Sequence, residues 1–428
     1  METQTQTLTP EEQKAIETCH PLVDDGWEQV RRRIPVDVDR LAQETKALQR
    51  KREVKSAWDL LRMALAYSLC DWSFRLVGVW ATVLGLGNLS DVAVRKRLRR
   101  ARAFMSQLVG EWLLHRRTQL ARRPARVRLI DATTASQPGS QGTDWRLHLS
   151  FDLGQFSLDE IEVTDASGGE TLVRHAAQAG EILVVDRGYA QCRGLGSILA
   201  VQGRVVARIN WQNLPLETVD GRPFDILAWA QAHIPLNQPA ETLVWMTQAH
   251  CRYELRLIAQ RLPPEAVEEA RRRIRQAARK KGRTPRHATL VAAEFILIVT
   301  NLPTHEWSAE QVLALYRLRW QVELVFKRLK GILDLEALRA KDPEIAQVYL
   351  LGKILAALIL QTWTDALPIE WMLDTVRPLS PWRWMTLWAD GLRQAIRGPL
   401  TLEQCWQALP KLARYLRDSP RKRRQQPG

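Results

Sequence analysis

The feature that most constrains the fold is a short unbroken apolar run, Ile182–Val185, within the sequence EILVVDRGY. Four consecutive apolar residues of this kind predict a central β-strand that is buried on both faces. Asp186 follows the run directly, so its carboxylate is expected at the end of that strand. The chain is therefore expected to contain a sheet that other elements cover on both sides.

Strand-like segments also precede this run. The sequence RVRLID alternates charged and apolar residues and ends on Asp131. Trp145–Leu153 alternates again, and Phe156–Val163 follows after a short turn, so the three segments predict an antiparallel meander. A helix is expected over Glu170–Ala179, between the meander and the apolar run.

The chain after Asp186 takes a long detour before a final strand and helix. Arg204–Ile209, Thr242–Thr247 and Tyr253–Ala259 predict strands. Pro264–Lys281 predicts a strongly charged helix, and EFILIVTNLP predicts another buried strand. A long helix is expected next, over Ser308–Leu333. Its first turn has the capping-box pattern of a serine followed three residues later by a glutamine.

Residues 1–120 are predicted to be helical. Trp58–Cys70 has apolar residues at helical spacing, and two further helices are expected, capped by Ser73 and Ser90 and separated by a glycine-containing turn. A helix, a short turn and a basic helix resemble a helix-turn-helix. The second helix carries six cations: Arg95, Lys96, Arg97, Arg99, Arg100 and Arg102. They form either a phosphate-binding surface or the solvated face of an ordinary helical hairpin.

The charge balance points to a polyanionic partner. The 428 residues include 62 Lys and Arg against 47 Asp and Glu, a formal net charge of +15. Such an excess favours nucleic acid, an anionic membrane surface or an acidic protein. The longest clean apolar run, Ile354–Leu360, is too short to span a bilayer, and the polar N-terminus does not resemble a secretory signal. The five cysteines are scattered without a CxxC pair, which fits a reducing cytosol, so a soluble cytoplasmic protein is expected.

Three acids occupy comparable positions. Asp131 and Asp186 each end a predicted strand, and Glu323 lies in the helix after a third strand. Grouped carboxylates repel one another, and two Mg²⁺ ions would relieve that repulsion and assist phosphoryl transfer. Each acid also has a simpler explanation. The aspartates fit turn or cap residues, and Glu323 fits an ion-pair ladder with Arg319 and Lys327, each four residues away.

The helix around Glu323 has two distinct faces. Within roughly 60° of one another, at a turn of 100° per residue, lie four polar residues: Tyr316, Arg319, Glu323 and Lys330. An opposing apolar stripe consists of Leu315, Leu318, Val322, Val325 and Leu329. The helix is expected to pack its apolar side on the sheet and to present an acid among cations, which suits metal ions and DNA phosphates.

This helix carries a specific resemblance. Its sequence LYRLRWQVELVFKRLK contains the spacing Y-x2-R-x3-E-x6-K, which resembles the Y-R-E-K signature of insertion-sequence DDE transposases. The sequences IDATT around Asp131 and VVDRGY around Asp186 resemble the first and second acidic motifs of that family, in the same order. WRLHLSFDL, TNLP and ELVFKRLK are also similar, so the resemblance runs from about residue 55 to 410.

The resemblance implies an RNase H-like catalytic domain. The expected fold class is α/β (α+β), a mixed sheet with flanking helices that is interrupted by a β-rich insertion. The implied division places a helical DNA-binding region in residues 1–120 and a helical C-terminal region with a basic tail in residues 341–428. It assigns residues 121–200 and 291–340 to the two parts of the catalytic domain and residues 201–290 to the insertion.

The resemblance also implies the chemistry. Asp131, Asp186 and Glu323 would be the catalytic and metal-binding acids, with two Mg²⁺ ions per site and Mn²⁺ as a substitute. The enzyme would cut and rejoin double-stranded DNA at terminal inverted repeats and in target DNA, as a homodimer at the nucleoid. DNA contacts are expected from Tyr316, Arg319, Lys330, Lys96, Arg97, Arg100 and Phe295.

Some alternatives stay open at this point. Phe295 stands where a relative would carry a tryptophan against a flipped base, but core packing also explains it, as it explains Trp211 and Trp245. An RNase H-like nuclease without strand transfer is a second function, although the Y-R-E-K helix and the insertion argue against it. The third possible function is that of a transposase-derived protein that binds DNA but no longer cuts it. This alternative predicts the loss of at least one of the three acids.

Overall fold

The computed structural model describes residues 26–49, 53–120, 126–137, 139–140, 142–154, 157–234, 238–335, 338–366 and 380–398. The chain forms two compact units. We call the first the helical unit; it comprises Met1–Thr118, Ala135–Asp144 and Lys327–Gly428. We call the second the sheet unit; it comprises Gln119–Thr134 and Trp145–Phe326.

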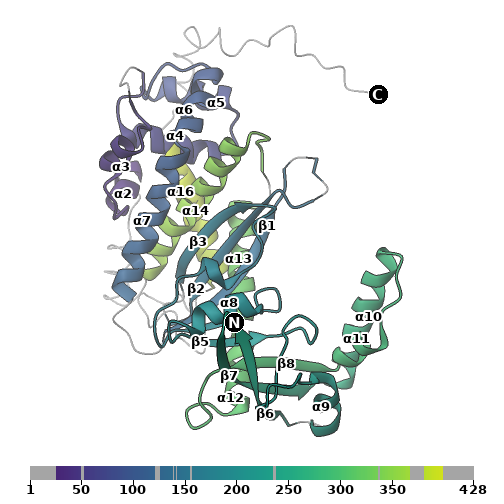
Figure 1. Cartoon of the computed structure of the whole chain (residues 1–428). Helices are drawn as coiled ribbons and strands as arrows, with labels where there is room; N and C mark the ends of the chain where they lie inside the picture. Colours follow the sequence, from purple (N-terminus) through teal and green to yellow (C-terminus); the bar gives the residue numbers. More distant parts are fainter. Residues whose placement is uncertain are drawn as a thin grey trace, which may run out of the picture. The chain divides into compact units, whose positions relative to one another are not determined.

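The sheet unit is built on a sheet with the strand order β3-β2-β1-β4-β5-β8-β7-β6 (Figure 1). Its strands are β1 (Val127–Ala135), β2 (Trp145–Asp152), β3 (Ser157–Asp165), β4 (Ile182–Val185), β5 (Arg204–Arg208), β6 (Ala240–Gln248), β7 (Cys251–Arg261) and β8 (Phe295–Thr300). β4 pairs in parallel with β1 and with β5, whereas β2 with β3, β5 with β8, β8 with β7 and β7 with β6 pair antiparallel. The chain therefore has the predicted α/β architecture with a mixed sheet, consistent with an RNase H-like fold.

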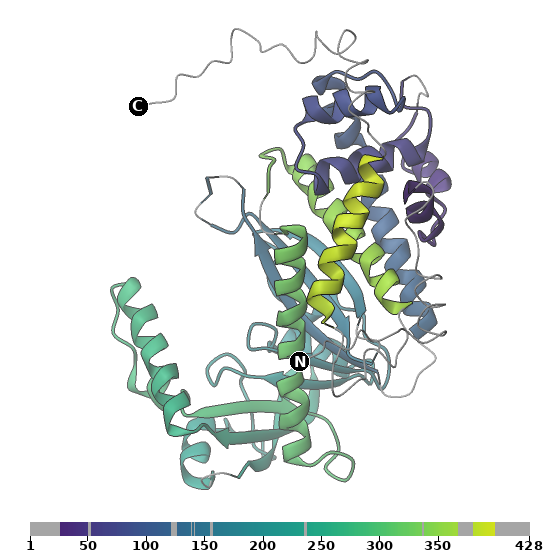
Figure 2. The ribbon, with the colours of Figure 1, turned by 180° about the vertical axis from the view of Figure 1, so that it is seen from behind.

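The apolar run forms β4 at the centre of this sheet, as predicted. All four of its side chains are buried, because helices cover both faces. Leu183 and Val185 belong to a core cluster that includes side chains of α8 (Cys192–Leu199). The helix α12 (Ala309–Leu318) contacts β4 and β5 from the opposite face (Figures 1 and 2).

The strands predicted in residues 201–290 extend the same sheet. β5 lies beside β4, and β7 and β6 continue the sheet beyond β8. The charged helix is also confirmed as α10 (Pro264–Lys280). Two short helices that the sequence pattern did not predict, α9 (Ile226–His233) and α11 (His287–Ala292), lie in the same part of the chain.

The prediction of a helix over Glu170–Ala179 is wrong. A single 3-10 turn, η1 (Leu172–Arg174), forms there and the remaining backbone is irregular. The carbonyl oxygen of Ala176 accepts a hydrogen bond from the buried guanidinium of Arg128 at 2.7 Å. A side chain from β1 therefore satisfies a backbone group that a helix would have used for its own hydrogen bonds.

The long helix predicted over Ser308–Leu333 is in fact two helices, α12 and α13 (Trp320–Leu333), which meet at Arg319. The predicted capping box at Ser308 is confirmed. The Arg319 N–H donates to the Tyr316 carbonyl at 3.0 Å, a tighter i to i−3 turn than the α-helical one. Neither proline nor glycine marks this junction, so the sequence carried no break signal.

The predicted apolar stripe of this helix is only partly confirmed. Leu315 is buried, but Leu318 at the end of α12 is 41% exposed. The side chains of Val322, Val325 and Leu329 lie outside the described residues.

The helical unit contains the predicted N-terminal helices. Its described helices are α2 (Gly26–Arg32), α3 (Val38–Glu44), α4 (Ala57–Leu69), α5 (Phe74–Val83), α6 (Asp91–Arg100), α7 (Arg102–Leu120), α14 (Pro343–Asp365) and α16 (Pro381–Arg397). Ser73 and Ser90 cap α5 and α6 as predicted, each accepting a backbone N–H at 3.3 Å. α4 packs against α14 and α16 at the centre of this unit.

The helix α14 has the length and apolar composition of a membrane-spanning helix, over Pro343–Thr364. Of its most apolar stretch, 83% is buried inside the protein, which is the environment of a core helix. In the described residues Cys70, Cys192 and Cys251 are free thiols, while the other two cysteines lie outside that part of the chain.

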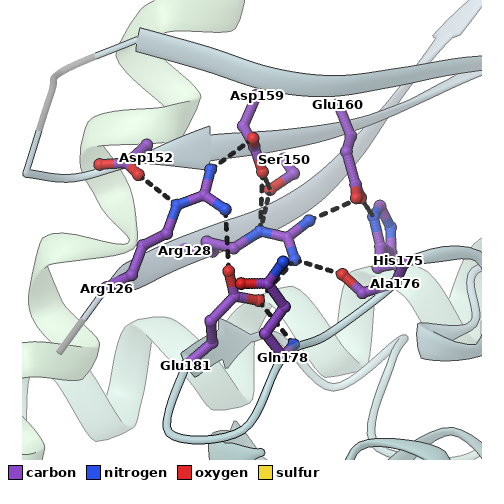
Figure 3. Close-up of polar contacts among 10 residues, drawn as sticks. All are labelled: Arg126, Arg128, Ser150, Asp152, Asp159, Glu160, His175, Ala176, Gln178 and Glu181. Carbon is purple, nitrogen blue, oxygen red and sulfur yellow. Dashed lines mark hydrogen bonds and ion pairs between the residues drawn. The ribbon is translucent and has the colours of Figure 1, made fainter. Parts of the chain in front are cut away.

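A buried ion network holds the beginning of β1 (Figure 3). Arg126 and Arg128 lie among four carboxylates that come from β2, β3 and the segment before β4. The ion pairs are Arg126–Asp152 at 2.6 Å, Arg126–Glu181 at 2.8 Å, Arg128–Asp159 at 2.8 Å, Arg128–Glu160 at 2.6 Å and Arg128–Glu181 at 3.2 Å. Arg126 also pairs with Asp159. The network joins four segments of the sheet unit away from bulk water.

Replacing Arg128 with Leu should destabilise the sheet unit by about 3–5 kcal/mol, because buried carboxylates would lose their guanidinium partner. Hydrogen exchange of β1 amides in the full chain under increasing urea would measure the loss. The control is Arg222→Leu, which breaks an exposed pair with Asp220 and should cost less than about 1 kcal/mol. Equal effects of the two variants would contradict a stabilising role of the network.

Candidate active site

Two of the predicted acids are brought side by side by strand register. β1 and β4 pair in parallel with Val127 opposite Ile182 and Leu129 opposite Val184. Continuing that register by two residues places Asp131 opposite Asp186. Neighbouring strands lie about 4.8 Å apart, and residues two positions along a strand share a face. Both carboxylates therefore leave the sheet from adjacent strands, on the face that α12 covers.

The junction of α12 and α13 brings the third acid to the same place. Arg319 Nη1 lies 3.2 Å from Asp131 Oδ2, and Arg319 Nη2 lies 2.6 Å from Glu323 Oε1. The side chains of Arg319 and Asp131 are mostly buried, while that of Glu323 is 38% exposed. One guanidinium thus joins an acid of β1 to an acid of α13.

The electrostatics of Asp131 reflect this crowding. Burial raises the pKa of Asp131 to about 6. The Ala132 N–H, which donates to its carboxylate at 2.8 Å, and the Arg319 guanidinium both oppose that shift. The nearby charges of Asp186 and Glu323 raise the pKa further. The charges of both other acids therefore act on Asp131, in addition to its burial.

A fourth carboxylate, that of Glu170, lies beside Asp186. A Cβ added at Gly188 would fall 2.0 Å from Glu170 Oε2 and 3.3 Å from Asp186 Oδ1, so both oxygens lie close to one point. Burial raises the pKa of Glu170, and the charge of Asp186 adds to that shift. The side-chain amide of Gln191 donates to the backbone carbonyls of both Glu170 and Gly188, which fixes the two segments together.

The other predicted residues of the Y-R-E-K pattern have different environments. Tyr316 is buried on α12, and the Arg319 guanidinium lies 5.9 Å from the centre of its ring. Lys330 is half-buried on the part of α13 that belongs to the helical unit. The structure thus brings Tyr316 and Arg319 together near the acids, and it describes Lys330 in the other unit.

The predicted base platform is a core residue in this structure. Phe295 is only 3% exposed at the start of β8, within the core cluster, and Arg261 lies 5.1 Å from the centre of its ring. Trp211 packs against the same cluster. Core packing, the alternative open from the sequence, accounts for both.

The cations of α6 divide into two groups. Arg95 pairs with Asp342 at 3.0 Å and Arg99 pairs with Glu344 at 2.7 Å, both at the start of α14. Lys96 and Arg100 are exposed, and Arg97 is half-buried. Ion pairing with α14 therefore occupies two of the five cations of α6, and the three candidates for DNA contact are not among them. The sixth predicted cation, Arg102, lies instead at the start of α7, where it donates a hydrogen bond to Gln347 Oε1 at 3.2 Å.

The chain resembles known transposases along most of its length. The family described as "Transposase DDE domain" matches residues 122–359, more than half of the chain and a range that includes all three acids. InsL of insertion sequence element IS186A from Escherichia coli (strain K12) is 37% identical over 347 residues, covering 78% of this chain and 93% of that protein. The transposase for IS421 from Escherichia coli is 37% identical over 348 residues with the same coverage. The chain belongs to the DDE transposase family. The transposase for IS231F from Bacillus thuringiensis subsp. israelensis is a more distant relative, 26% identical over 367 residues, or 75% of this chain and 76% of that protein.

DDE transposases depend on divalent metal ions, and the acids of this transposase fit such ions in kind. Carboxylate oxygens are the ligands that Mg²⁺ prefers, and Asp131, Asp186 and Glu323 each carry one carboxylate. No three metal-ligating side chains among the described residues lie close enough together to hold an ion as they stand. Arg319 lies between two of the acids instead.

Sequence reasoning missed Glu170 as a neighbour of Asp186 in this transposase. The pattern around it predicted a helix, which would have carried its side chain away from the strand end. The irregular backbone that replaces the helix places Glu170 against Gly188. No periodicity signals such a contact, because it depends on side chains of β1 that hold the loop.

The buried histidine of β2 predicts a pH dependence of stability. His148 is fully buried, with its ring nitrogens 3.4 Å from the Tyr189 hydroxyl and 3.1 Å from the Thr164 hydroxyl. Burial lowers its pKa from 6.5 to about 4, with the charges of Arg174, His175 and Arg146 adding to the shift. The unfolded chain binds more protons between these values, so this stability is present above pH 6.5 and lost as pH falls toward 4.

We expect His148→Gln to lessen the loss of stability between pH 6.5 and 4, because the variant has no imidazole to protonate. Urea unfolding of both proteins at several pH values, followed by hydrogen exchange of β2 amides, provides the measurement. A loss of the same size in the wild type and in the variant would exclude His148 as its source.

Proposed function

We propose that this transposase cleaves DNA at the ends of an insertion sequence and transfers the freed strands to target DNA. Asp131, Asp186 and Glu323 would be its catalytic and metal-binding acids. The observation that carries the proposal is the bridge from Asp131 through Arg319 to Glu323, next to the strand end of Asp186. One guanidinium is shared by two of these acids, and the charges of Asp186 and Glu323 both act on Asp131, which supports a common site.

The acids would hold two Mg²⁺ ions, for which Mn²⁺ would substitute. Bound metal would activate the attacking oxygen and stabilise the leaving oxygen of phosphoryl transfer. Arg319 would have to leave Asp131 and Glu323 as metal enters, because a guanidinium and a metal ion compete for the same carboxylate oxygens. The released guanidinium, with its planar array of donors, would then bind a DNA phosphate.

Further contacts with double-stranded DNA would come from both units. Tyr316 and Lys330 would act with Arg319 near the cut, and Lys96, Arg97 and Arg100 would contact the terminal inverted repeats. Joining two element ends requires two active sites in one complex, so we propose a homodimer on DNA. The reaction would take place in the cytoplasm, at the nucleoid.

A nuclease that lacks strand transfer would use the same three acids, so the products separate the two functions. Joined DNA products support the transposase, whereas breaks without joining support the nuclease. A transposase-derived protein that only binds DNA would give neither product. Its prediction of a lost acid is not met, since all three acids are in place.

Glu323→Gln should reduce cleavage by at least 10³-fold and leave DNA binding within about twofold, because the exchange removes a charge and preserves the side-chain shape. The measurement is cleavage of a plasmid that carries the DNA flanking this gene, with Mg²⁺ and with EDTA. Metal-dependent breaks at discrete sites, lost in the variant, are the expected result. Parallel losses of binding and cleavage would assign Glu323 a structural role.

Arg319→Ala should weaken DNA binding and lower the slope of log K against log salt by about one, because one phosphate contact is lost. The matched control is Arg317→Ala. That side chain is exposed on the same helix and bonds Gln260 Oε1 at 3.3 Å instead of the acids. A salt slope that is the same in wild type and Arg319→Ala would rule out the phosphate contact.

A further inference from the structure

The helix α10 divides along its length into an acidic half and a basic half. Its acids, Glu265, Glu268 and Glu269, all lie in the first six residues, and the next acid along the chain is Glu294. The helix leaves the end of the sheet and carries a single buried residue, Val267, near its beginning (Figure 1). Most of its length is therefore surrounded by solvent.

The arginines nearest the sheet are already neutralised. Arg272 and Arg273 both pair with Glu269, at 2.6 and 2.8 Å. Arg271 pairs with Glu294 at 2.8 Å and with Glu268 at 3.2 Å. These pairs lie within α10 or join it to the segment before β8, so they account for the first group of cations as structural contacts.

The distal half of α10 and the turn that follows it carry six further cations, all of them exposed: Arg275, Arg279, Lys280, Lys281, Arg283 and Arg286. We call these six residues the distal cations. Within the described part of the chain, no ion pair joins any of them to an acid. Gly282, at φ +61°, ends the helix and turns the chain back toward α11, which keeps the six together.

Helix formation alone does not require this arrangement. Cations in the last turn of a helix interact favourably with its dipole, which accounts for Arg279 and Lys280. Arg275 lies four residues before Arg279 and shares its face, where like charges repel. Arg283 and Arg286 lie beyond the helix end. The surface as a whole is a concentration of positive charge that an outside polyanion would stabilise.

We infer that the distal cations form a binding surface for the phosphate backbone of double-stranded DNA. The inference rests on the proposed function for the choice of DNA as the polyanion. The spacing of cations along an exposed helix and turn suits a row of phosphates and provides no base-reading side chains, so the contact would be independent of sequence. A membrane surface fits less well, because the distal half presents no broad apolar face to enter a bilayer.

The test uses two double variants on the same helix that remove the same charge. Arg275→Gln with Arg279→Gln changes the distal cations, and Arg272→Gln with Arg273→Gln changes arginines that are ion-paired. Gln keeps a high helix propensity, so circular dichroism should be unchanged in both. Binding to a 30-base-pair duplex without element ends is measured over a series of salt concentrations, with all proteins also carrying Glu323→Gln to prevent cleavage.

The distal variant should lower the slope of log K against log salt by about two, since two phosphate contacts are lost, and the paired variant by less than half as much. Equal changes of the salt slope in the two variants would mean that the loss of net charge alone explains the effect, which would overturn the inference. An unchanged slope in both would also overturn it. So would normal DNA binding by the distal variant combined with lost binding to phosphatidylserine vesicles.

A third variant guards against a folding defect in the helix. Arg283→Gln with Arg286→Gln lies outside α10 and should lower the salt slope by a similar amount; normal binding by this variant would count against the surface. The outcome is separable from that of the proposed function. Binding is measured without cleavage, whereas the proposed function is tested by the cleaved and joined DNA products of the wild type and of Glu323→Gln.

Discussion

Parallel pairing of β1 with β4 sets the geometry on which the rest of the site depends. The register places Asp131 opposite Asp186, and side chains alternate between the two faces of the sheet. A slip of one residue would move Asp131 to the face of α8 and would move Arg128 to the face of α12. The buried ion network opposes such a slip, because Arg128 would lose the carboxylates of β3 and of the segment before β4. The network on one face thus secures the acids on the other.

Acids pair with arginines on both faces of β1, but the two environments differ. On one face, Arg126 and Arg128 form ion pairs with acids that are buried away from solvent. On the other, Arg319 neutralises Asp131 and Glu323 through a helix junction that is partly exposed. A guanidinium in that position favours the ionised form of Asp131. Arginines therefore pair with acids on both faces of the strand, within a buried network on one face and at a partly exposed helix junction on the other.

Local pattern predicted the parts of this structure that depend on local physics. The unbroken apolar run Ile182–Val185 predicted a buried strand, and Ser73, Ser90 and Ser308 were predictable as helix caps. The irregular segment after Glu170 was not predictable, since it is stabilised by Arg128 from a distant strand. The junction at Arg319 was not predictable either, because it carries no proline or glycine. Sequence motifs predicted Asp131, Asp186 and Glu323 as the acids of the site, whereas the position of Glu170 beside Asp186 depends on a tertiary contact.

The joining of β7 and β6 to the sheet has a consequence for how this fold can vary. Residues 210–293 contribute both strands that lie beyond β8, so a shortened chain without them would leave β8 at the margin of the sheet. The backbone N–H and C=O groups of β8 that now pair with β7 would then face solvent. An apolar edge strand with unpaired backbone groups favours pairing with a strand of another molecule. β6, the present margin, exposes the polar side chains of Glu241 and Thr247 beside that of Leu243, and the backbone of Trp245 exchanges hydrogen bonds with that of Glu217. Residues 210–293 thereby keep the apolar strand β8 away from the margin of the sheet.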